Sequence, residues 1–510
     1  MKKTLSSRVN LSLMSTIEVV LINRMAIVLY LAAIAVLFPV PVDAYNFNFL
    51  DDRAYLELKG DLTYSVKFRV ENPAPELKED SKGNSNFDKG DKVNNKAIAK
   101  MEAFFDAPYV SFFGKFEAFY DDVYTDDDLF PEGTDIDTAK DYAEKDLVAK
   151  EYYIDLHSDR TTLRLGKQIV EWGELAAPVF APGVDVMNMY DGTSVGAAGY
   201  TLRDYKVPAE SAWMIREISN NLSVEAVYSR DFEPRNIVSV VGTFGSFIDQ
   251  LGFGGPTILQ DKRPQSSKDM EQYGAAIRTV FPSVENLELG LYYANYLHPF
   301  PMNDLSKDQT TYEETDMYGF TLSRVVKEWQ VYGEFTYRPH HPAQLTREDF
   351  GGAPIGGFEK VRTLNWGVGA LKLYTDFFPS LPYTVTFSPL VELYGGNNLD
   401  YDDLDDDDTM AFDIPEHTAY YLATLDFSSP DMVDNTTMNF TMAFTGALHS
   451  EERSFHSIGT TLKARIGDHI ELLLGYDVKL GDTDKASLND YPGGIPDRDA
   501  VTLAFTWYFM

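Results

Sequence analysis

The chain has 510 residues, with 44 lysines and arginines against 79 aspartates and glutamates, and it has no cysteine. The lack of cysteine excludes disulfides, thiolate metal sites, iron–sulfur clusters and covalently attached c-type haem. The formal net charge of −35 argues against nucleic acid as a partner, because phosphate backbones require basic surfaces.

The first predicted element in chain order is an export signal. Residues 25–42 form an apolar stretch that follows several basic residues, and Val42-Asp43-Ala44 resembles a cleavage site. The pattern predicts a signal peptide at residues 1–44 and a mature chain at residues 45–510. An uncleaved membrane anchor is the alternative, which the two prolines at 39 and 41 disfavour.

The mature chain is dominated by alternation with a period of two residues. In residues 61–70, Leu62, Tyr64 and every second residue after them are apolar, and the residues between them are polar. Residues 501–509 repeat the scheme. Successive strand side chains point to opposite faces, so each strand has one apolar and one polar face. No later stretch approaches the ~20 apolar residues that a membrane helix needs.

Loop lengths separate a soluble sandwich from a membrane barrel. Eight short turns alternate with nine long polar loops along the whole chain. The short turns are expected at 107–108, 158–160, 219–221, 282–285, 326–328, 378–382, 428–435 and 467–468. This alternation is typical of outer-membrane barrels, whose periplasmic turns are short and whose extracellular loops are long. We therefore predict an all-β fold: a transmembrane, antiparallel, up-and-down β-barrel of about 18 strands (16–18), located in the outer membrane of a Gram-negative cell after Sec export.

Two of the long loops hold about half of the negative charge. Residues 121–147 carry eleven acidic and two basic residues, and residues 396–416 carry nine acidic residues and no lysine or arginine. Within the second loop, Asp402, Asp405 and Asp407 are weak candidates for a Ca²⁺ site, since calcium prefers carboxylate oxygens. A solvated, repulsive loop is the simpler interpretation.

One loop differs from the others because it is apolar. Residues 163–174 (LRLGKQIVEWGE) form a strand that ends in a Trp-Gly-Glu corner, and residues 175–190 follow it. Exposed apolar surface is costly, so we expect the loop at 171–206 to fold into the lumen as a constriction or plug. An ordinary packed loop at the rim is the alternative. The residues proposed to line the lumen or its constriction are Lys115, Glu117, Arg164, Gln168, Trp172, Glu174, Asp185, Asn188 and Asp191.

The same segment resembles a known family. Residues 163–174, with residues 182–191 (PGVDVMNMYD), are similar to the core of the DUF1302 family of proteobacterial outer-membrane proteins, a domain of unknown function. Residues 85–95 and 119–124 are also similar, so the resemblance covers about residues 60–200. It implies an outer-membrane barrel that serves as a channel for organic solutes, and it implies no reaction.

These observations predict a porin-like channel for small or hydrophobic organic solutes. Alternatives are a barrel sheath around an electron conduit, a structural outer-membrane protein and, less favoured, a barrel enzyme. We expect no catalytic residue and no cofactor. The expected partners are outer-membrane lipid and lipopolysaccharide, the barrel-assembly machinery, and a periplasmic or inner-membrane transport component. No nucleic acid is expected.

Overall fold

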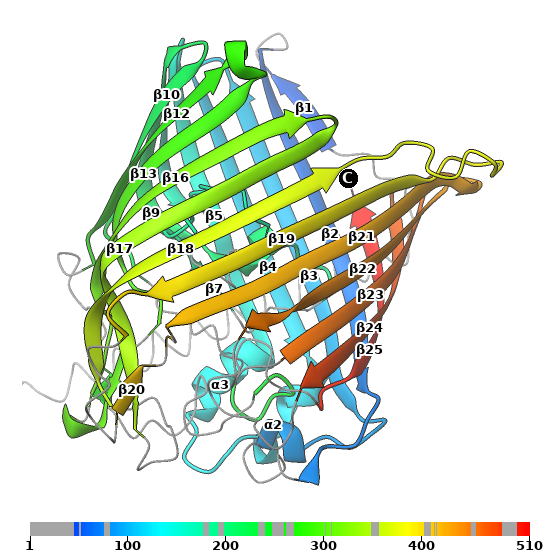
Figure 1. Ribbon diagram of the computed structural model, residues 1–510. Helices are drawn as coiled ribbons and strands as arrows, with labels where there is room; N and C mark the ends of the chain where they lie inside the picture. Colours follow the sequence, from blue (N-terminus) through cyan, green and yellow to red (C-terminus); the bar gives the residue numbers. More distant parts are fainter. Residues whose placement is uncertain are drawn as a thin grey trace, which may run out of the picture.

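The protein is a closed barrel of eighteen antiparallel strands (Figure 1). The computed structural model describes residues 45–49, 53–75, 82–176, 183–191, 198–232, 240–246, 260–261, 270–300, 302–307, 309–347, 356–401, 410–412, 414, 416–449, 455–481 and 497–509. The barrel strands are β2 (Ala54–Arg69), β3 (Lys92–Ala107), β4 (Val110–Asp121), β5 (Lys145–Ser158), β6 (Thr161–Gln168), β9 (Ala209–Ser219), β10 (Leu222–Ser229), β12 (Gln272–Phe281), β13 (Leu287–Leu297), β16 (Glu314–Val326), β17 (Trp329–Arg347), β18 (Phe358–Lys372), β19 (Thr386–Asn398), β21 (His417–Val433), β22 (Thr436–His449), β23 (Phe455–Ile466), β24 (Ile470–Gly481) and β25 (Ala500–Phe509).

The barrel closes between its first and last strands. β2 pairs with β25 in a register that runs from Gly60 opposite Phe509 to Arg69 opposite Ala500. The short strand β1 (Tyr45–Phe49) pairs with the beginning of β2, directly beyond the point where β25 ends. The predicted signal peptide at residues 1–44 lies outside the described residues. The predicted strand number and the closed antiparallel topology are confirmed.

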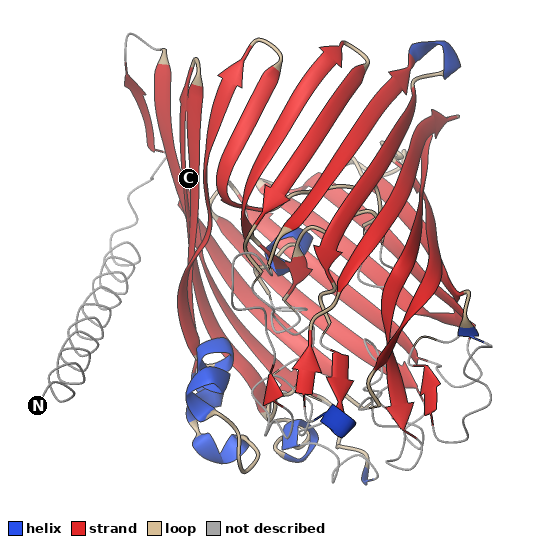
Figure 2. Cartoon of the chain, turned by 90° about the vertical axis from the view of Figure 1, so that its left-hand side faces the viewer, coloured by secondary structure: helices blue, strands red, loops and turns tan. Residues whose placement is uncertain are grey.

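Short turns gather at one end of the barrel and long loops at the other, as predicted (Figure 2). The β16–β17 turn is tight because Lys327 and Glu328 both adopt positive φ, as a two-residue type I′ hairpin requires. Two predicted turns differ from the observed ones. β18 and β19 are joined by a longer connection, 373–385, and β21 continues to Val433, so only two residues remain for the turn expected at 428–435.

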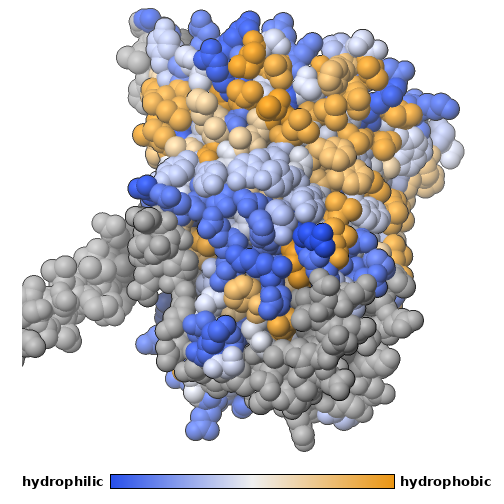
Figure 3. Space-filling model, turned by 60° about the vertical axis from the view of Figure 1, so that its left-hand side comes forward, coloured by the Kyte–Doolittle hydropathy of each residue, from blue (hydrophilic) through white to orange (hydrophobic). Residues whose placement is uncertain are grey.

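The alternation of side chains divides the wall into an inner and an outer face. On β2, Thr63, Ser65 and Arg69 are buried toward the lumen, and Tyr64 between them is exposed on the outside. Apolar residues gather in a broad band on the outer wall (Figure 3). An apolar outer face on a closed barrel is stable in lipid, so the protein lies in the outer membrane. Among the described helices, none is long and apolar enough to span a bilayer.

The long loops form small elements of their own. These are α2 (Lys82–Ser85), η2 (Asp122–Thr125), η3 (Asp127–Leu129), α3 (Ile136–Ala143), η7 (Leu305–Lys307), β20 (Met410–Phe412) and the sheet of β11 (Gln260–Asp261), β15 (Gln309–Thr311) and β14 (Met302–Asp304). At the other end of the barrel, η6 (Pro282–Val284) lies in the short turn between β12 and β13. In the acidic loop at 121–147, Asp126 caps η3 and Asp135 caps α3 through their side chains. The three candidate Ca²⁺ ligands, Asp402, Asp405 and Asp407, lie outside the described residues.

Several of these loops pack together over the long-loop end of the barrel. Phe87, Tyr124, Phe130 and Phe244 belong to one buried cluster that joins three loops. Beside it, the fully buried guanidinium of Arg69 donates to the carbonyl oxygens of Asn84 and Phe87 and to the Asp497 carboxylate. A buried charge needs such partners, so Arg69 ties the first and last long loops to the wall.

Candidate functional site

The candidate site is the connection between β6 and β9, residues 169–208, which we call the inner segment. It contains β7 (Met189–Tyr190), η5 (Leu202–Tyr205) and β8 (Lys206–Val207), and β7 pairs with β8. Figures 1 and 2 show these elements within the barrel outline. The described parts of the segment contact inward-facing residues of β3–β5 on one side and of β17–β19 on another.

The two ends of the inner segment are joined at its neck. Asn188 accepts a hydrogen bond from the Val170 N–H over 2.7 Å and donates to the Val207 carbonyl over 2.9 Å. Its amide also donates to the carbonyl of Gln168, whose own side chain donates to the Ser211 carbonyl. A single buried asparagine thus satisfies backbone groups at both ends of the segment.

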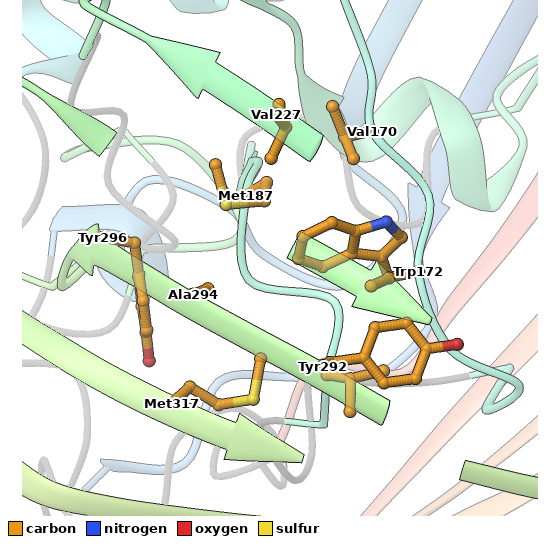
Figure 4. Packing of buried hydrophobic residues seen from close by; sticks show 10 residues of the cluster. Val170, Trp172, Met187, Val227, Tyr292, Ala294, Tyr296 and Met317 are labelled. Atoms are coloured by element: carbon orange, nitrogen blue, oxygen red, sulfur yellow. The ribbon is translucent and has the colours of Figure 1, made fainter. Parts of the chain in front are cut away.

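An apolar cluster packs the segment against the wall (Figure 4). Val170, Trp172, Val184 and Met187 of the segment contact Val227, Ala276, Tyr292, Ala294, Tyr296 and Met317 of β10, β12, β13 and β16. Trp172 and Tyr292 lie with ring centroids 5.6 Å apart. Gly274 leaves room for the indole, since a Cβ there would lie 2.6 Å from Trp172 Cη2. The side chains of Val170, Trp172, Val184 and Met187 are therefore buried against the wall.

Below this cluster, Glu225 of β10 is the polar partner of the indole. Its Oε2 accepts hydrogen bonds from Nε1 of Trp172 over 3.0 Å and from Nε1 of Trp213 over 3.1 Å. Its other oxygen lies 3.1 Å from Nε of Arg278 on β12. Buried Trp N–H groups need such an acceptor, so Glu225 holds the Trp-Gly-Glu corner to the wall.

Two carboxylates on the strands that follow β16 around the wall bind the segment through its backbone. Glu334 of β17 accepts hydrogen bonds from the N–H groups of Glu174, Leu175 and Val184, the last two at 3.0 Å. Glu392 of β19 accepts from the Ala176 N–H over 2.9 Å. Hydrogen bonds to ionised acceptors are stronger than neutral ones. These two residues therefore fix a loop backbone that has no strand partner of its own.

Arg338 of β17 completes this anchor from the donor side. Its Nη2 donates to the Gly183 carbonyl over 2.8 Å, and its Nε donates to the Tyr296 hydroxyl over 2.9 Å. The Arg338 side chain is fully buried. The β17 wall thus supplies both acceptors and donors to the same stretch of the inner segment.

Ion pairs hold the far end of the segment on the β3–β5 wall. Asp204 accepts from Lys115 over 2.5 Å and from Lys100 over 3.1 Å. Burial opposes ionisation of Asp204, but the two ammonium groups outweigh it and hold the pKa of this carboxyl well below its usual range. Arg203 donates to Glu151 over 2.8 Å, and the Tyr200 hydroxyl donates to Glu117 over 2.7 Å.

Most predicted lumen residues take part in these contacts. Lys115, Glu117, Gln168, Trp172 and Asn188 do so through their side chains, and Glu174 does so through its backbone. Asp191 is buried and donates its N–H to the Tyr205 carbonyl.

Asp185 and Arg164 differ from that group. Asp185 pairs with Lys206 inside the segment, and its pKa is raised to about 6 because burial outweighs the lysine. Arg164 belongs to the wall: it forms an ion pair with Asp155 at 2.7 Å and lies over the Tyr153 ring. This pairing joins β5 and β6, since Asp155 and Arg164 lie opposite each other in the ladder.

Sequence reasoning missed the residues that receive the segment. Glu225, Glu334, Arg338 and Glu392 all lie at polar positions of alternating strands, which is the only signal that the sequence carries for them. Their partners within the inner segment are 53 to 216 residues away along the chain. Among the described residues there is no group of three or more His, Asp or Glu side chains that could hold a metal ion.

One known family matches nearly the whole chain. The model of a family described as "Protein of unknown function (DUF1302)" matches residues 25–509. No curated protein sequence matches the chain.

Solved structures are matched at low identity. Salmonella typhi OmpF in complex with daunomycin is 9% identical, covering 91% of this chain and 100% of that chain, with a TM-score of 0.43. Acinetobacter baumannii OccAB4 is 11% identical, covering 89% and 97%, with a TM-score of 0.45. Pseudomonas aeruginosa OccK2 in complex with glucuronate is 10% identical, covering 91% and 99%, with a TM-score of 0.43.

Proposed function

This chain belongs to the DUF1302 family, and we propose that it is a non-enzymatic outer-membrane channel for small organic solutes in which the inner segment forms the constriction. The observation that carries the proposal is the attachment of the segment to two distant parts of the wall. Glu334 and Glu392 bind its backbone on one side, and Lys100 and Lys115 bind Asp204 on the other. A chain held from both sides narrows the lumen.

This arrangement favours a channel over a sheath. A sheath around an electron conduit needs a lumen that can admit another protein. Here an internal apolar cluster and several buried ion pairs occupy the lumen with the protein's own chain. Displacing them would expose apolar surface and unpaired charges, both of which are costly.

The cargo that we propose is small and organic, and the support for hydrophobic cargo is weaker. Hydrophobic cargo was expected because the loop is apolar, but Val184 and Met187 of that loop are buried against the wall. The pocket beside the segment is instead bordered by charged groups such as Glu174 and Arg278. Such lining suits polar organic solutes better than oily ones.

Planar-bilayer conductance of the refolded protein tests the constriction. Residues 171–206 can be deleted and replaced by a short Gly-Ser linker, because Asn188 bridges Val170 and Val207 and so places both ends close together. We expect small steps from the intact protein and conductance several-fold larger from the deletion variant. Deletion of the described tip of the acidic loop, residues 131–134, is the control and should leave the conductance unchanged. Equal conductance with and without residues 171–206 would reject the constriction.

A further inference from the structure

A pocket lies beside the inner segment at the short-turn end of the lumen. Its volume is about 310 Å³, and it is bounded by the segment and by β9, β10, β12, β13 and β16. The charged and aromatic groups that line it are Glu174, Glu217, Arg278, Glu288 and Tyr292, together with the amide of Asn221. This volume is at the lower end of the range of small-molecule sites.

Arg278 is held in a fixed position at one side of this pocket. Its Nε lies 3.1 Å from Glu225, which the two indole N–H groups also use, and its guanidinium lies over the Tyr292 ring at 5.6 Å. Its side chain nevertheless remains 38% exposed. Its Nη2 also lies 3.5 Å from the Glu171 carbonyl oxygen, a long contact that holds the guanidinium beside the segment. A solute can therefore pair with the exposed part of a guanidinium that is already held in place, which lowers the entropic cost of binding.

Negative groups line the same pocket. Glu174, Glu217 and Glu288 form no ion pair within the described part of the chain, and Glu217 and Glu288 are exposed to the pocket. Burial and the charge of Glu288 raise the pKa of the Glu174 carboxyl, while Arg278 lowers it. Glu174 and Glu288 are thus close enough to repel each other, and an added positive charge would relieve that repulsion.

We propose that this pocket binds a small zwitterionic solute, whose carboxylate pairs with Arg278 and whose ammonium group lies between Glu174 and Glu288. The inference rests on the proposed channel function and names the class of solute that the channel takes. An anion alone would meet the repulsion of the glutamates, and a cation alone would meet the repulsion of Arg278. A solute with both groups satisfies each side, and the Tyr292 and Asn221 side chains add polar contacts.

Titration calorimetry of the refolded barrel in detergent tests this site without requiring conduction. The probes are 6-aminohexanoate, hexanoate and hexylamine, which share one carbon chain and differ in charge. We expect measurable binding of 6-aminohexanoate and at least tenfold weaker binding of the other two. E288Q changes an exposed residue that has no ion pair among the described residues. It should weaken binding of 6-aminohexanoate several-fold and should not weaken binding of hexanoate.

R278A should abolish binding of the zwitterion. R278K keeps a positive charge beside Glu225 and should therefore restore part of that binding. R465A, a change to an arginine on β23 outside the pocket, should leave binding unchanged. Equal binding of the three probes, absent binding of all of them, or unchanged binding in E288Q would overturn the site. A protein that conducts but does not bind rejects only the site, and one that binds but never conducts rejects only the channel.

Discussion

Trp172 and Glu225 join the inner segment to the barrel wall, with the indole N–H of one donating to the carboxylate of the other over 3.0 Å. The indole also fills the space above Gly274 and lies beside Tyr292. One side chain thus supplies both the apolar contact and the polar contact of the corner. The docking of the segment therefore depends strongly on Trp172, whereas the folding of the barrel strands depends on it less.

Trp172→Ala is expected to loosen the segment while the barrel remains folded. Truncation of a buried Trp costs about 3–5 kcal/mol, and here that cost falls on docking because Trp172 belongs to no strand. Single-channel recording should show larger or noisier currents. Trp172→Phe keeps most of the packing and loses the donor, so its effect should be smaller. Unchanged currents in Trp172→Ala would count against a gating role for this corner.

Glu334→Gln should weaken the backbone anchor. Glutamine offers one acceptor oxygen and places an NH₂ group among N–H donors, whereas hydrogen bonds to a charged acceptor contribute about 1.5–3 kcal/mol. Amide hydrogen exchange at Leu175 and Val184 should become faster by about 10- to 100-fold, since each 1.4 kcal/mol corresponds to about tenfold. Glu471→Gln, on β24, is the matched control and should leave these amides protected. Unaltered protection in Glu334→Gln would show that the segment is held elsewhere.

Gly319→Ala tests how closely the segment packs on the wall. A Cβ at this position would lie 2.5 Å from Val184 Cγ1 and 3.0 Å from Met317 Sδ, so the segment must move away or the wall must deform. Overpacking of this kind costs about 1–3 kcal/mol. Conductance should change as it does for Trp172→Ala. At Gly475 the nearest atom would lie 3.5 Å away, so Gly475→Ala should behave as the natural protein does.

Acid is expected to release the segment, and the two titrating aspartates act in opposite directions. The pKa of Asp204 is lowered in the docked state, so its contribution to docking is present above the ordinary value of about 4 and is lost as the pH falls below that value. The pKa of Asp185 is raised to about 6, so its contribution to docking is fully present below the ordinary value of about 4 and is lost as the pH rises to about 6.

Conductance should therefore be lowest near pH 4, should rise between about pH 4 and 6 as Asp185 ionises, and should also rise below pH 4 as Asp204 is protonated. Recording from pH 8 to pH 3 checks this profile. Asp204→Asn should remove the rise at low pH, and Asp185→Asn should flatten the change above pH 4. A rise at low pH that persists in Asp204→Asn would assign it to other groups.

The sequence by itself determined the barrel. Alternation along a strand depends only on the geometry of the extended chain, so the faces of β2 and β25 could be assigned without knowing their neighbours. The alternation of short and long connections predicted the number of strands and showed that short turns lie at one end of the barrel and long loops at the other. The local motif at 163–174, with its apolar continuation, also marked the segment that enters the lumen.

Only the tertiary structure decided what that segment meets. Closure of the barrel aligns Arg278, Gly290, Thr321, Glu334 and Gly367 in one row across five strands. Inside that row, Glu334 meets the backbone of Leu175, more than 150 residues earlier in the chain. Because the inward positions of the strands are generally polar, the sequence does not distinguish one inward-facing charged residue from another. Which of them anchors the segment, and which lines the pocket with Arg278, depends on the register of the closed barrel and the path of one loop across it.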